Sequence, residues 1–188
     1  MSGSVALVLL AAGRGSRFGG GKLAATLAGK PVIAHVAAAT HALPLAQRIL
    51  VAAPDVPGLP GFARVALEPP DAPQSRSLAL GLAAVGDAQA VLIALADMPL
   101  VPPAHFARML EAFDGDRLTS VCEGQRLPPA LLGRAHFAAL GALTGDRGAG
   151  ALLRDAPTLP LTPDQALDID TPADLARAER LLVPPTAP

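Results

Sequence analysis

The 188-residue sequence contains no tryptophan, no tyrosine and a single cysteine, Cys122. Without tryptophan and tyrosine, the chain lacks the usual aromatic platforms on which proteins stack the bases of single-stranded nucleic acid. One cysteine cannot form an internal disulfide, which suits a reducing compartment, so we expect a cytoplasmic protein.

The sequence also lacks a surplus of either charge and an apolar run of membrane length. The 15 Lys and Arg residues nearly balance the 16 Asp and Glu residues, whereas nucleic-acid-binding domains usually carry a surplus of basic residues. Apolar residues make up 51% of the chain, but the run at residues 90–96 stops at Asp97, well short of a membrane span. We therefore expect neither nucleic acid nor membrane as a partner.

Short apolar runs alternate with helical patterns along the chain. The four expected strands are Val5–Leu10, Arg48–Ala53, Arg64–Leu67 and Ala90–Leu95. The four expected helices are Pro31–His41, Ser75–Val85, Pro102–Phe113 and Thr171–Leu182. This alternation predicts an α/β fold: a single Rossmann-like domain with three α/β/α layers and a mostly parallel sheet. We assign residues 1–183 to this domain and expect residues 184–188 to form a disordered tail.

A loop rich in glycine and cationic residues follows the first expected strand. Residues 13–22 contain five glycines together with Arg14, Arg17 and Lys22. Glycine lets a ligand approach bare backbone N–H groups, and arginine and lysine bind phosphate. Such a loop after a buried strand predicts a polyphosphate-binding site.

The loop matches neither of two common phosphate-binding motifs. In the P-loop a Gly-Lys pair is followed by Ser or Thr, but here Leu23 follows, and Ser16 stands where the first glycine belongs. The dinucleotide fingerprint fails because Phe18 occupies its third glycine position. An oxidoreductase with a nicotinamide coenzyme therefore stays an alternative that bound NAD would support.

The sequence L-A-A-G-x-G-x-R-F-G-x-x-K, from Leu10 to Lys22, resembles the signature of nucleotidyltransferases with a GT-A-like fold. The resemblance implies that Arg17 and Lys22 are catalytic and stabilise the α-phosphate and the leaving pyrophosphate. It also implies a set of nucleotide-binding residues in the same stretch: Leu10, Ala11, Ala12, Gly13, Arg14 and Gly15.

Residues 73–82 resemble the motif G-x-S-x-S-L-x-x-G-L of this family, whose serines lie beside the nucleotide base. The resemblance implies that Ser75 and Ser77 bind nucleotide, although Pro73 stands where the motif has its leading glycine. Ser75 alone could instead cap the following helix, and both interpretations stay open.

Asp97 directly follows a buried strand, where an ionisable group is costly unless it is paired or bound to a cation. A hard ion such as Mg²⁺ binds one or two carboxylates together with phosphate oxygens. The D-M-P sequence resembles the metal-binding aspartate motif of the family, with Ala96 in the nucleotide site. Residues 168–175 resemble D-I-D-T-P-E-D-L, which implies Asp170 as a second metal ligand, with helix capping as its alternative. We expect Mg²⁺, with Mn²⁺ as the alternative ion.

Two further segments resemble the molybdenum cofactor nucleotidyltransferases. Residues 124–132 are similar to G-x-R-G-N/H-P-V-L-F, and residues 143–153 are similar to G-D-x-G-A-R-x-L-L of the cytidylyltransferase branch. The implied acceptor-binding residues are Arg126, Gly145, Asp146 and Gly148. Leu127, Pro128 and Gly150 depart from these motifs, which leaves the acceptor open.

The motifs together identify a nucleotidyltransferase of the molybdenum cofactor type. The implied reaction transfers a nucleoside monophosphate from a nucleoside triphosphate to a phosphorylated acceptor and releases pyrophosphate. The L-A-A-G sequence favours CTP over GTP. The implied acceptor is a phosphorylated pterin, molybdopterin, and the implied client is a molybdoenzyme. The alternatives are a guanylyltransferase of the same cofactor, a sugar-1-phosphate-type enzyme, and a non-catalytic module that binds nucleotide or cofactor.

Overall fold

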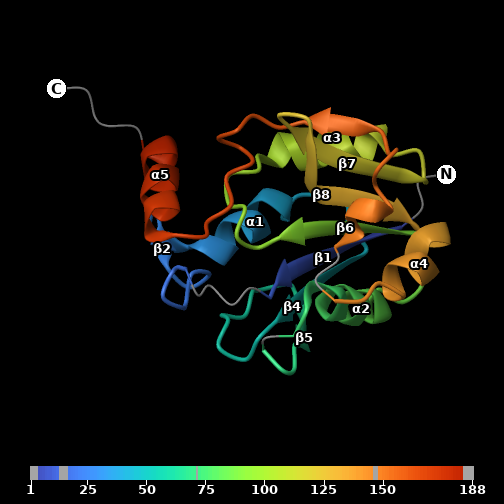
Figure 1. Ribbon diagram of the computed structural model, residues 1–188, viewed down its shortest axis with the longest axis horizontal. Helices are drawn as coiled ribbons and strands as arrows, with labels where there is room; N and C mark the ends of the chain where they lie inside the picture. Colours follow the sequence, from blue (N-terminus) through green and yellow to red (C-terminus); the bar gives the residue numbers. More distant parts are fainter. Residues whose placement is uncertain (1–3, 13–16, 71, 146–147, 184–188) are drawn as a thin grey trace.

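The computed structural model describes residues 4–12, 17–70, 72–145 and 148–183. The strands of its main sheet are β1 (Val5–Ala11), β4 (Gln47–Ala52), β5 (Ala63–Ala66), β6 (Ala90–Leu95), β7 (Arg117–Cys122), β8 (Gln125–Gly133) and β9 (Thr158–Pro160). They lie in the order β5-β4-β1-β6-β8-β7-β9 (Figure 1). Two short strands, β2 (Thr26–Leu27) and β3 (Lys30–Pro31), form a separate hairpin.

Most of the sheet is parallel. β1 pairs in parallel with β4 and β6, and β4 pairs in parallel with β5. β8 is antiparallel to both β6 and β7, and β7 pairs in parallel with β9. In the described part of the chain, β8 is therefore the one strand of this sheet that opposes the other six. The predicted mostly parallel α/β domain is confirmed. Three strands of this sheet, β7, β8 and β9, were not predicted from the sequence, and neither was the β2–β3 hairpin.

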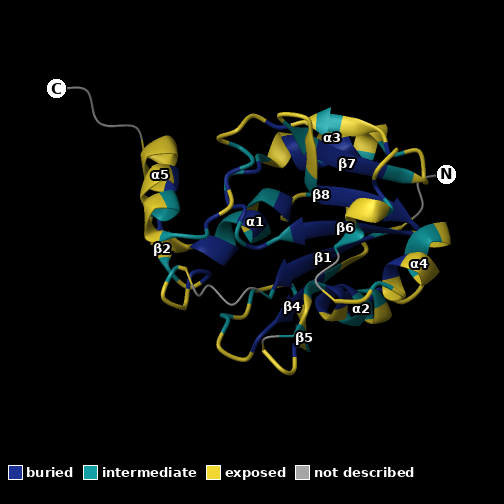
Figure 2. Ribbon diagram, viewed as in Figure 1, coloured by how far each residue is buried: buried dark blue, intermediate teal, exposed yellow. Residues whose placement is uncertain are grey.

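Helices cover both faces of the sheet. The described helices are α1 (Val32–Thr40), α2 (Gln74–Ala84), α3 (Pro103–Ala112), α4 (Phe137–Gly141) and α5 (Pro172–Leu182), with 3₁₀ turns η1 (Arg134–His136) and η2 (Ala149–Ala151). Helix α5 stands beyond the ends of the strands, beside β2 (Figure 1). Alternate residues of β1 enter two separate cores, because successive strand residues point to opposite faces. Leu7 and Leu9 pack in the core that includes α1 and α3, whereas Ala6 and Val8 pack in the core with α2 and α4. Figure 2 shows the buried central strands between exposed helix surfaces.

Helix α2 packs directly on the centre of the sheet. A Cβ atom built on Gly81 would lie 2.4 Å from Cγ1 of Val8, far closer than van der Waals contact. The absence of a side chain at Gly81 therefore lets α2 approach β1. A crossover helix runs antiparallel to its strands, so the N-terminus of α2 lies at the carboxyl end of β1.

The loop after β1 lies where the strand order changes direction, since β4 pairs on one side of β1 and β6 on the other. Ligands of open α/β sheets bind beyond the carboxyl ends of the strands at such a position. The backbone N–H of Ala96 donates to Leu10 O at 2.9 Å, which holds the ends of β1 and β6 side by side. Across the described ranges, no helix combines the length and apolar character needed to cross a membrane.

Candidate active site at the carboxyl end of the sheet

Three consecutive glycines bring the chain to Lys22. Gly19, Gly20 and Gly21 have φ angles of 88°, 96° and 65°, in the left-handed region that favours glycine. The N–H of Ala24 then donates to Gly21 O at 3.0 Å, which closes a turn around Lys22. The residue is only 5% exposed. Of the predicted nucleotide-binding loop, Gly13, Arg14 and Gly15 lie outside the described residues.

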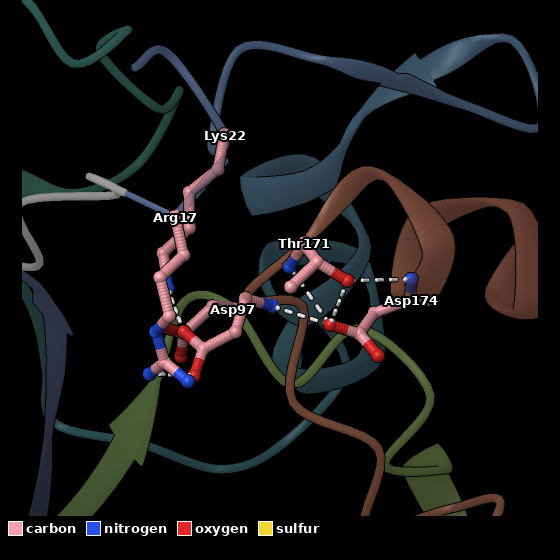
Figure 3. Close-up of polar contacts among 6 residues, drawn as sticks. Arg17, Lys22, Asp97, Thr171 and Asp174 are labelled. Atoms are coloured by element: carbon pink, nitrogen blue, oxygen red, sulfur yellow. Dashed lines mark hydrogen bonds and ion pairs between the residues drawn. The ribbon is translucent and has the colours of Figure 1, made fainter. Parts of the chain in front are cut away.

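Lys22 contacts both predicted metal ligands, and Arg17 contacts one of them, Asp170 (Figure 3). Lys22 Nζ donates to Asp97 Oδ2 at 2.6 Å and to Asp170 Oδ1 at 3.1 Å. Arg17 Nη2 donates to Asp170 Oδ2 at 2.5 Å. Burial acts to lower the pKa of Lys22, but the charge of Asp97 and hydrogen bonds to Asp97 and Asp170 outweigh it and raise the pKa above its usual value. Lys22 is therefore a fully charged ammonium group.

A third carboxylate, Asp168, belongs to the same cluster. The N–H of Ile169 donates to Asp97 O at 2.9 Å, and Ile169 itself is fully buried. This contact holds the flanking Asp168 and Asp170 beside Asp97, and one oxygen from each of the three carboxylates lies within 4.8 Å of the others. We call these three residues the carboxylate triad. Asp168 was not expected from the sequence to bind the metal, although its two-residue spacing from Asp170 was the available signal.

The triad has the donor chemistry of a site for a hard divalent cation. Asp168 keeps an exposed surface, but partial desolvation of its carboxyl group and the charge of Asp97 raise its pKa to about 7. Three carboxylates this close repel one another, and the Lys22 ammonium stands among them as a cation. Oxygen ligands from carboxylates are those that Mg²⁺ and Mn²⁺ prefer, so the residues present fit such an ion.

Asp170 does not cap the final helix. The N-cap of α5 is Thr171, whose Oγ1 accepts from the N–H of Asp174 at 3.2 Å. The Asp174 carboxylate in turn accepts from the N–H of Thr171 at 2.7 Å (Figure 3). This reciprocal pair is a capping box. It leaves the side chain of Asp170 for Arg17 and Lys22, so the capping alternative for Asp170 is wrong.

The predicted nucleotide and acceptor segments meet at a second feature, a cavity of about 160 Å³ that we call the apolar cavity. It is lined by Leu10, Gln74, Leu78, Ile93, Leu95, Arg126, Leu127, Pro128, Ala130, Gly148, Ala149, Gly150 and Leu153. Leu10 comes from the predicted nucleotide set, and Arg126 and Gly148 come from the predicted acceptor set. Arg126 is exposed and donates to Ala156 O at 3.1 Å. The cavity walls are otherwise almost entirely aliphatic.

The start of α2 is joined to the acceptor segment. The N–H of Ser75 donates to Gly145 O at 3.3 Å. Pro73 is the N-cap of α2, so the alternative that Ser75 caps the helix is wrong. Ser75 and Ser77 are both buried, and Ser77 Oγ has no hydrogen-bond partner in the described part of the chain. Asp146 lies outside the described residues.

A second cavity, of about 100 Å³, lies between the glycines before Lys22 and the loop after β4. Lys22 and Asp55 contribute its charged groups, and Ala11 lines its wall. Leu10 and Ala11 are neighbours in β1, but they line different cavities, because successive strand residues point to opposite faces of the sheet. Ala12 is half-buried, and Ala96 is fully buried beside β1.

Comparison with known proteins gives a family match and several relatives. A family model described as MobA-like NTP transferase domain matches residues 7–161. A 2-C-methyl-D-erythritol 4-phosphate cytidylyltransferase of Xanthomonas campestris is 36% identical over 133 residues, which are 64% of this chain and 50% of the relative. The bifunctional protein GlmU of Rhizorhabdus wittichii is 32% identical over 119 residues, 59% of this chain and 26% of the relative. The chain therefore spans about half the length of the first relative.

Solved structures share the fold. Rv0371c of Mycobacterium tuberculosis has a TM-score of 0.84 at 23% identity and covers 96% of this chain and 100% of its own. Its complex with manganese has a TM-score of 0.80 at 24% identity, with 94% and 98% covered. A nucleotidyl transferase from Methanothermobacter has a TM-score of 0.79 at 24% identity, with 95% and 97% covered. At these identities the likeness shows the fold alone.

Proposed function

The chain belongs to the MobA-like NTP transferase domain family, and from this premise we propose that it is a nucleotidyltransferase. It would transfer a nucleoside monophosphate from a nucleoside triphosphate to a phosphorylated acceptor and release pyrophosphate. The observation that carries the proposal is the contact of Lys22 and Arg17 with the carboxylate triad at the ends of β1 and β6. Phosphoryl transfer depends mainly on positioning and charge neutralisation, and this cluster supplies charges of both signs.

The proposed reaction is a direct in-line displacement. A phosphate oxygen of the acceptor forms a bond to the α-phosphorus, and the bond from that phosphorus to the bridging oxygen of the β-phosphate breaks. The electron pair leaves with pyrophosphate, so no covalent intermediate with the protein is required. Lys22, held by its turn, and Arg17, at the open side, would bind the oxygens of the triphosphate and offset the charge that develops on the leaving group.

The carboxylate triad would hold a divalent ion, Mg²⁺ or Mn²⁺. When bound, such an ion neutralises phosphate charge and orients phosphate oxygens. The manganese complex of Rv0371c supports a divalent ion in a protein of this fold. Within this chain, Asp97 and Asp170 also orient Lys22 and Arg17, and the buried Ile169 fixes the distance between the two parts of the triad.

CTP is the favoured donor. The Xanthomonas relative is a cytidylyltransferase, and the L-A-A-G sequence at Leu10 resembles the cytidylyl pattern. Ser75, Ser77 and Ala96 would lie with the loop residues around the nucleotide. Burying a phosphate against aliphatic walls is costly, so the apolar cavity would receive an uncharged part of a substrate. The phosphates would lie at the charged cluster, which consists of Arg17, Lys22 and the carboxylate triad.

Two acceptor classes are supported by different observations. The segments that contain Arg126 and Gly148 resemble molybdenum cofactor enzymes and support a phosphorylated pterin, with a molybdoenzyme as client. The 36% identical relative acts on a phosphorylated polyol, which supports that class as the second candidate. In either case Arg126, Gly145, Asp146 and Gly148 would contact the acceptor.

Pyrophosphate release tests the proposal directly. Purified protein is incubated with Mg²⁺ and each of CTP, GTP, UTP and ATP, together with molybdopterin or 2-C-methyl-D-erythritol 4-phosphate. We expect release that requires both substrates and is fastest with CTP. A parallel thermal-shift panel that includes NAD measures binding, since a ligand of the native state raises its stability. Binding of nucleotide without any release would favour a non-catalytic module, and a shift with NAD alone would favour an oxidoreductase.

A further inference from the structure

A buried ammonium group occupies the centre of the charged cluster. Lys22 is 5% exposed, and its Nζ lies 2.6 Å from Asp97 Oδ2 and 3.1 Å from Asp170 Oδ1. One cation therefore already bridges two of the three carboxylates that the proposed function assigns to a divalent ion. Arg17 contacts the other oxygen of Asp170, so a second cation shares the same acid.

A divalent ion and this ammonium group would compete for the same oxygens. Mg²⁺ binds carboxylate oxygens at about 2.0–2.1 Å, closer than the ammonium of Lys22 approaches Asp97. Two cations that share one carboxylate oxygen lie close together and repel each other. Lys22 is almost fully buried, so water screens this repulsion only in part. Binding of the ion to Asp97 and Asp170 therefore requires Lys22 Nζ to move away from them.

We propose that Lys22 holds the place of the metal ion in the nucleotide-free protein and leaves the triad when a triphosphate arrives. This inference rests on the proposed function. A triphosphate offers the ammonium group new anionic partners, which frees Asp97 and Asp170 for the ion. Nucleotide and metal then bind with positive coupling, and this coupling acts equally on both affinities. Lys22 thereby keeps the metal from binding tightly until the substrate is present.

Removal of the ammonium group should improve metal binding while it destroys catalysis. The test uses Mn²⁺ alone, titrated into nucleotide-free protein, with free Mn²⁺ followed by electron paramagnetic resonance. Lys22→Met keeps an aliphatic chain of similar length without the charge. We expect it to bind Mn²⁺ at least about tenfold more tightly than wild type. An unchanged or weaker affinity would overturn the proposal.

A matched control removes the same charge elsewhere. Lys30 is an exposed lysine on β3, and its contribution to the field at the triad is screened by water. Lys30→Met should leave the Mn²⁺ affinity within about twofold of wild type. An equal gain in Lys30→Met and Lys22→Met would mean that net charge, and not occupation of the site, governs binding, and would overturn the proposal.

Thermal unfolding gives a second readout that does not depend on activity. Without Lys22, the carboxylates of Asp97 and Asp170 lose their buried partner, so Lys22→Met should melt below wild type in EDTA. Added Mn²⁺ should raise its melting temperature by more than that of wild type, because the ion replaces the missing cation. An equal or smaller rise in the variant would contradict the exchange.

A double variant separates this inference from the proposed function. Lys22→Met combined with Asp168→Asn should lose the gain in Mn²⁺ affinity, which would locate the gain at the triad. A retained gain would overturn the exchange at this site. If the wild-type protein releases pyrophosphate but Lys22→Met binds Mn²⁺ no more tightly than wild type, the exchange is rejected and the proposed function is kept. Absence of release with every substrate pair, together with a gain in Lys22→Met, would reject the function and keep the exchange.

Discussion

The charged cluster and the apolar cavity both adjoin the end of β1, yet they have opposite chemistry. On one side, two cations contact a triad of carboxylates, with Lys22 almost fully buried. On the other, Gln74 and Arg126 are the polar side chains among the residues that line the cavity. A substrate that spans both would have its charge neutralised at one side and its shape recognised at the other.

The two sides should respond differently to mutation. Removing one member of a buried ion pair leaves its partner charged and unpaired, which is strongly destabilising. The cluster therefore has little tolerance for change. Aliphatic walls tolerate substitutions that keep their volume, so changes at the apolar cavity should alter affinity and substrate choice more than the rate of the chemical step.

The largest effect should come from the charged cluster. Lys22→Ala and Asp97→Ala each remove a group proposed to meet the reacting phosphates. We expect each to lower kcat in the pyrophosphate-release assay by about 10³-fold or more, since loss of one electrostatic stabiliser costs roughly 10²–10³ and these groups also position each other. Near wild-type rates in either variant would refute the proposed mechanism. Lys30→Ala, which removes an exposed lysine, should leave kcat unchanged.

A smaller and different effect is expected at the apolar cavity. A Cβ atom on Gly148 would lie 2.9 Å from Gln74 Oε1, so Gly148→Ala should displace the end of that flexible side chain. Its φ of −75° allows alanine without backbone strain. We expect KM for the substrate that enters the apolar cavity to rise about three- to tenfold, while kcat is nearly unchanged. This is the result expected when an interaction of equal strength in the ground state and the transition state is lost.

Gly150 provides the matched control for this change. It lines the same cavity, but a Cβ atom there has no atom within 4 Å among the described neighbours. Gly150→Ala should therefore leave KM unchanged. Equal effects of the two substitutions would show that backbone flexibility, and not the position of Gln74, controls this side.

The residues of the charged cluster could be predicted from the sequence because they stand in short, dense motifs. Arg17 and Lys22 belong to one loop. Asp97 lies two residues after β6, whose bounds are those that the apolar pattern predicts. Asp168 was not assigned to the metal because the motif alone does not reveal which oxygens converge. That convergence depends on the hydrogen bond from Ile169 to Asp97 O, a contact between segments far apart in the chain.

The apolar side was much harder to predict. β8 contains Pro128 and Pro129, and proline within a run argues against a strand. β9 is only three residues long, too short for an alternation to be visible. The cavity also combines side chains from several elements, and no local pattern records their distance. The sequence therefore predicted individual acceptor residues such as Arg126, but not the aliphatic enclosure beside them.

A buried histidine lies beneath β7, the strand that pairs with β8 of the apolar side. His105 on α3 is buried, and its Nε2 lies 2.8 Å from Oγ of Ser120 on β7. Burial, with a smaller contribution from Arg108, lowers its pKa. The unfolded chain then binds more protons than the folded one below about pH 6.5, so stability falls as the pH drops through and below this value.

A variant without His105 isolates the contribution of this histidine to the pH dependence of stability. His105→Gln removes the titrating ring while it retains a polar side chain. We expect its urea midpoint to fall less than that of wild type between pH 7.5 and pH 5.5. Identical pH dependence in both proteins would mean that other groups, such as the carboxylate triad, dominate the response.

The smallest effects should come from two turns, one on each side, that hold a side-chain-bearing residue in the left-handed region. Ala28 has a φ of 46° between β2 and β3, and Glu123 has a φ of 49° between β7 and β8. Glycine adopts this conformation without the cost of about 1–2 kcal/mol that other residues meet, although it also makes the unfolded chain more flexible. Ala28→Gly and Glu123→Gly should each raise the free energy of unfolding by about 0.5–1 kcal/mol in urea titrations. The N–H of Ala28 donates to Glu179 Oε2 at 2.7 Å. If the φ of Ala28 is the source of the gain, Ala28→Gly should stabilise the protein equally in a Glu179→Ala background. Loss of the gain in that background would mean that the contact with Glu179, and not φ, determines the turn.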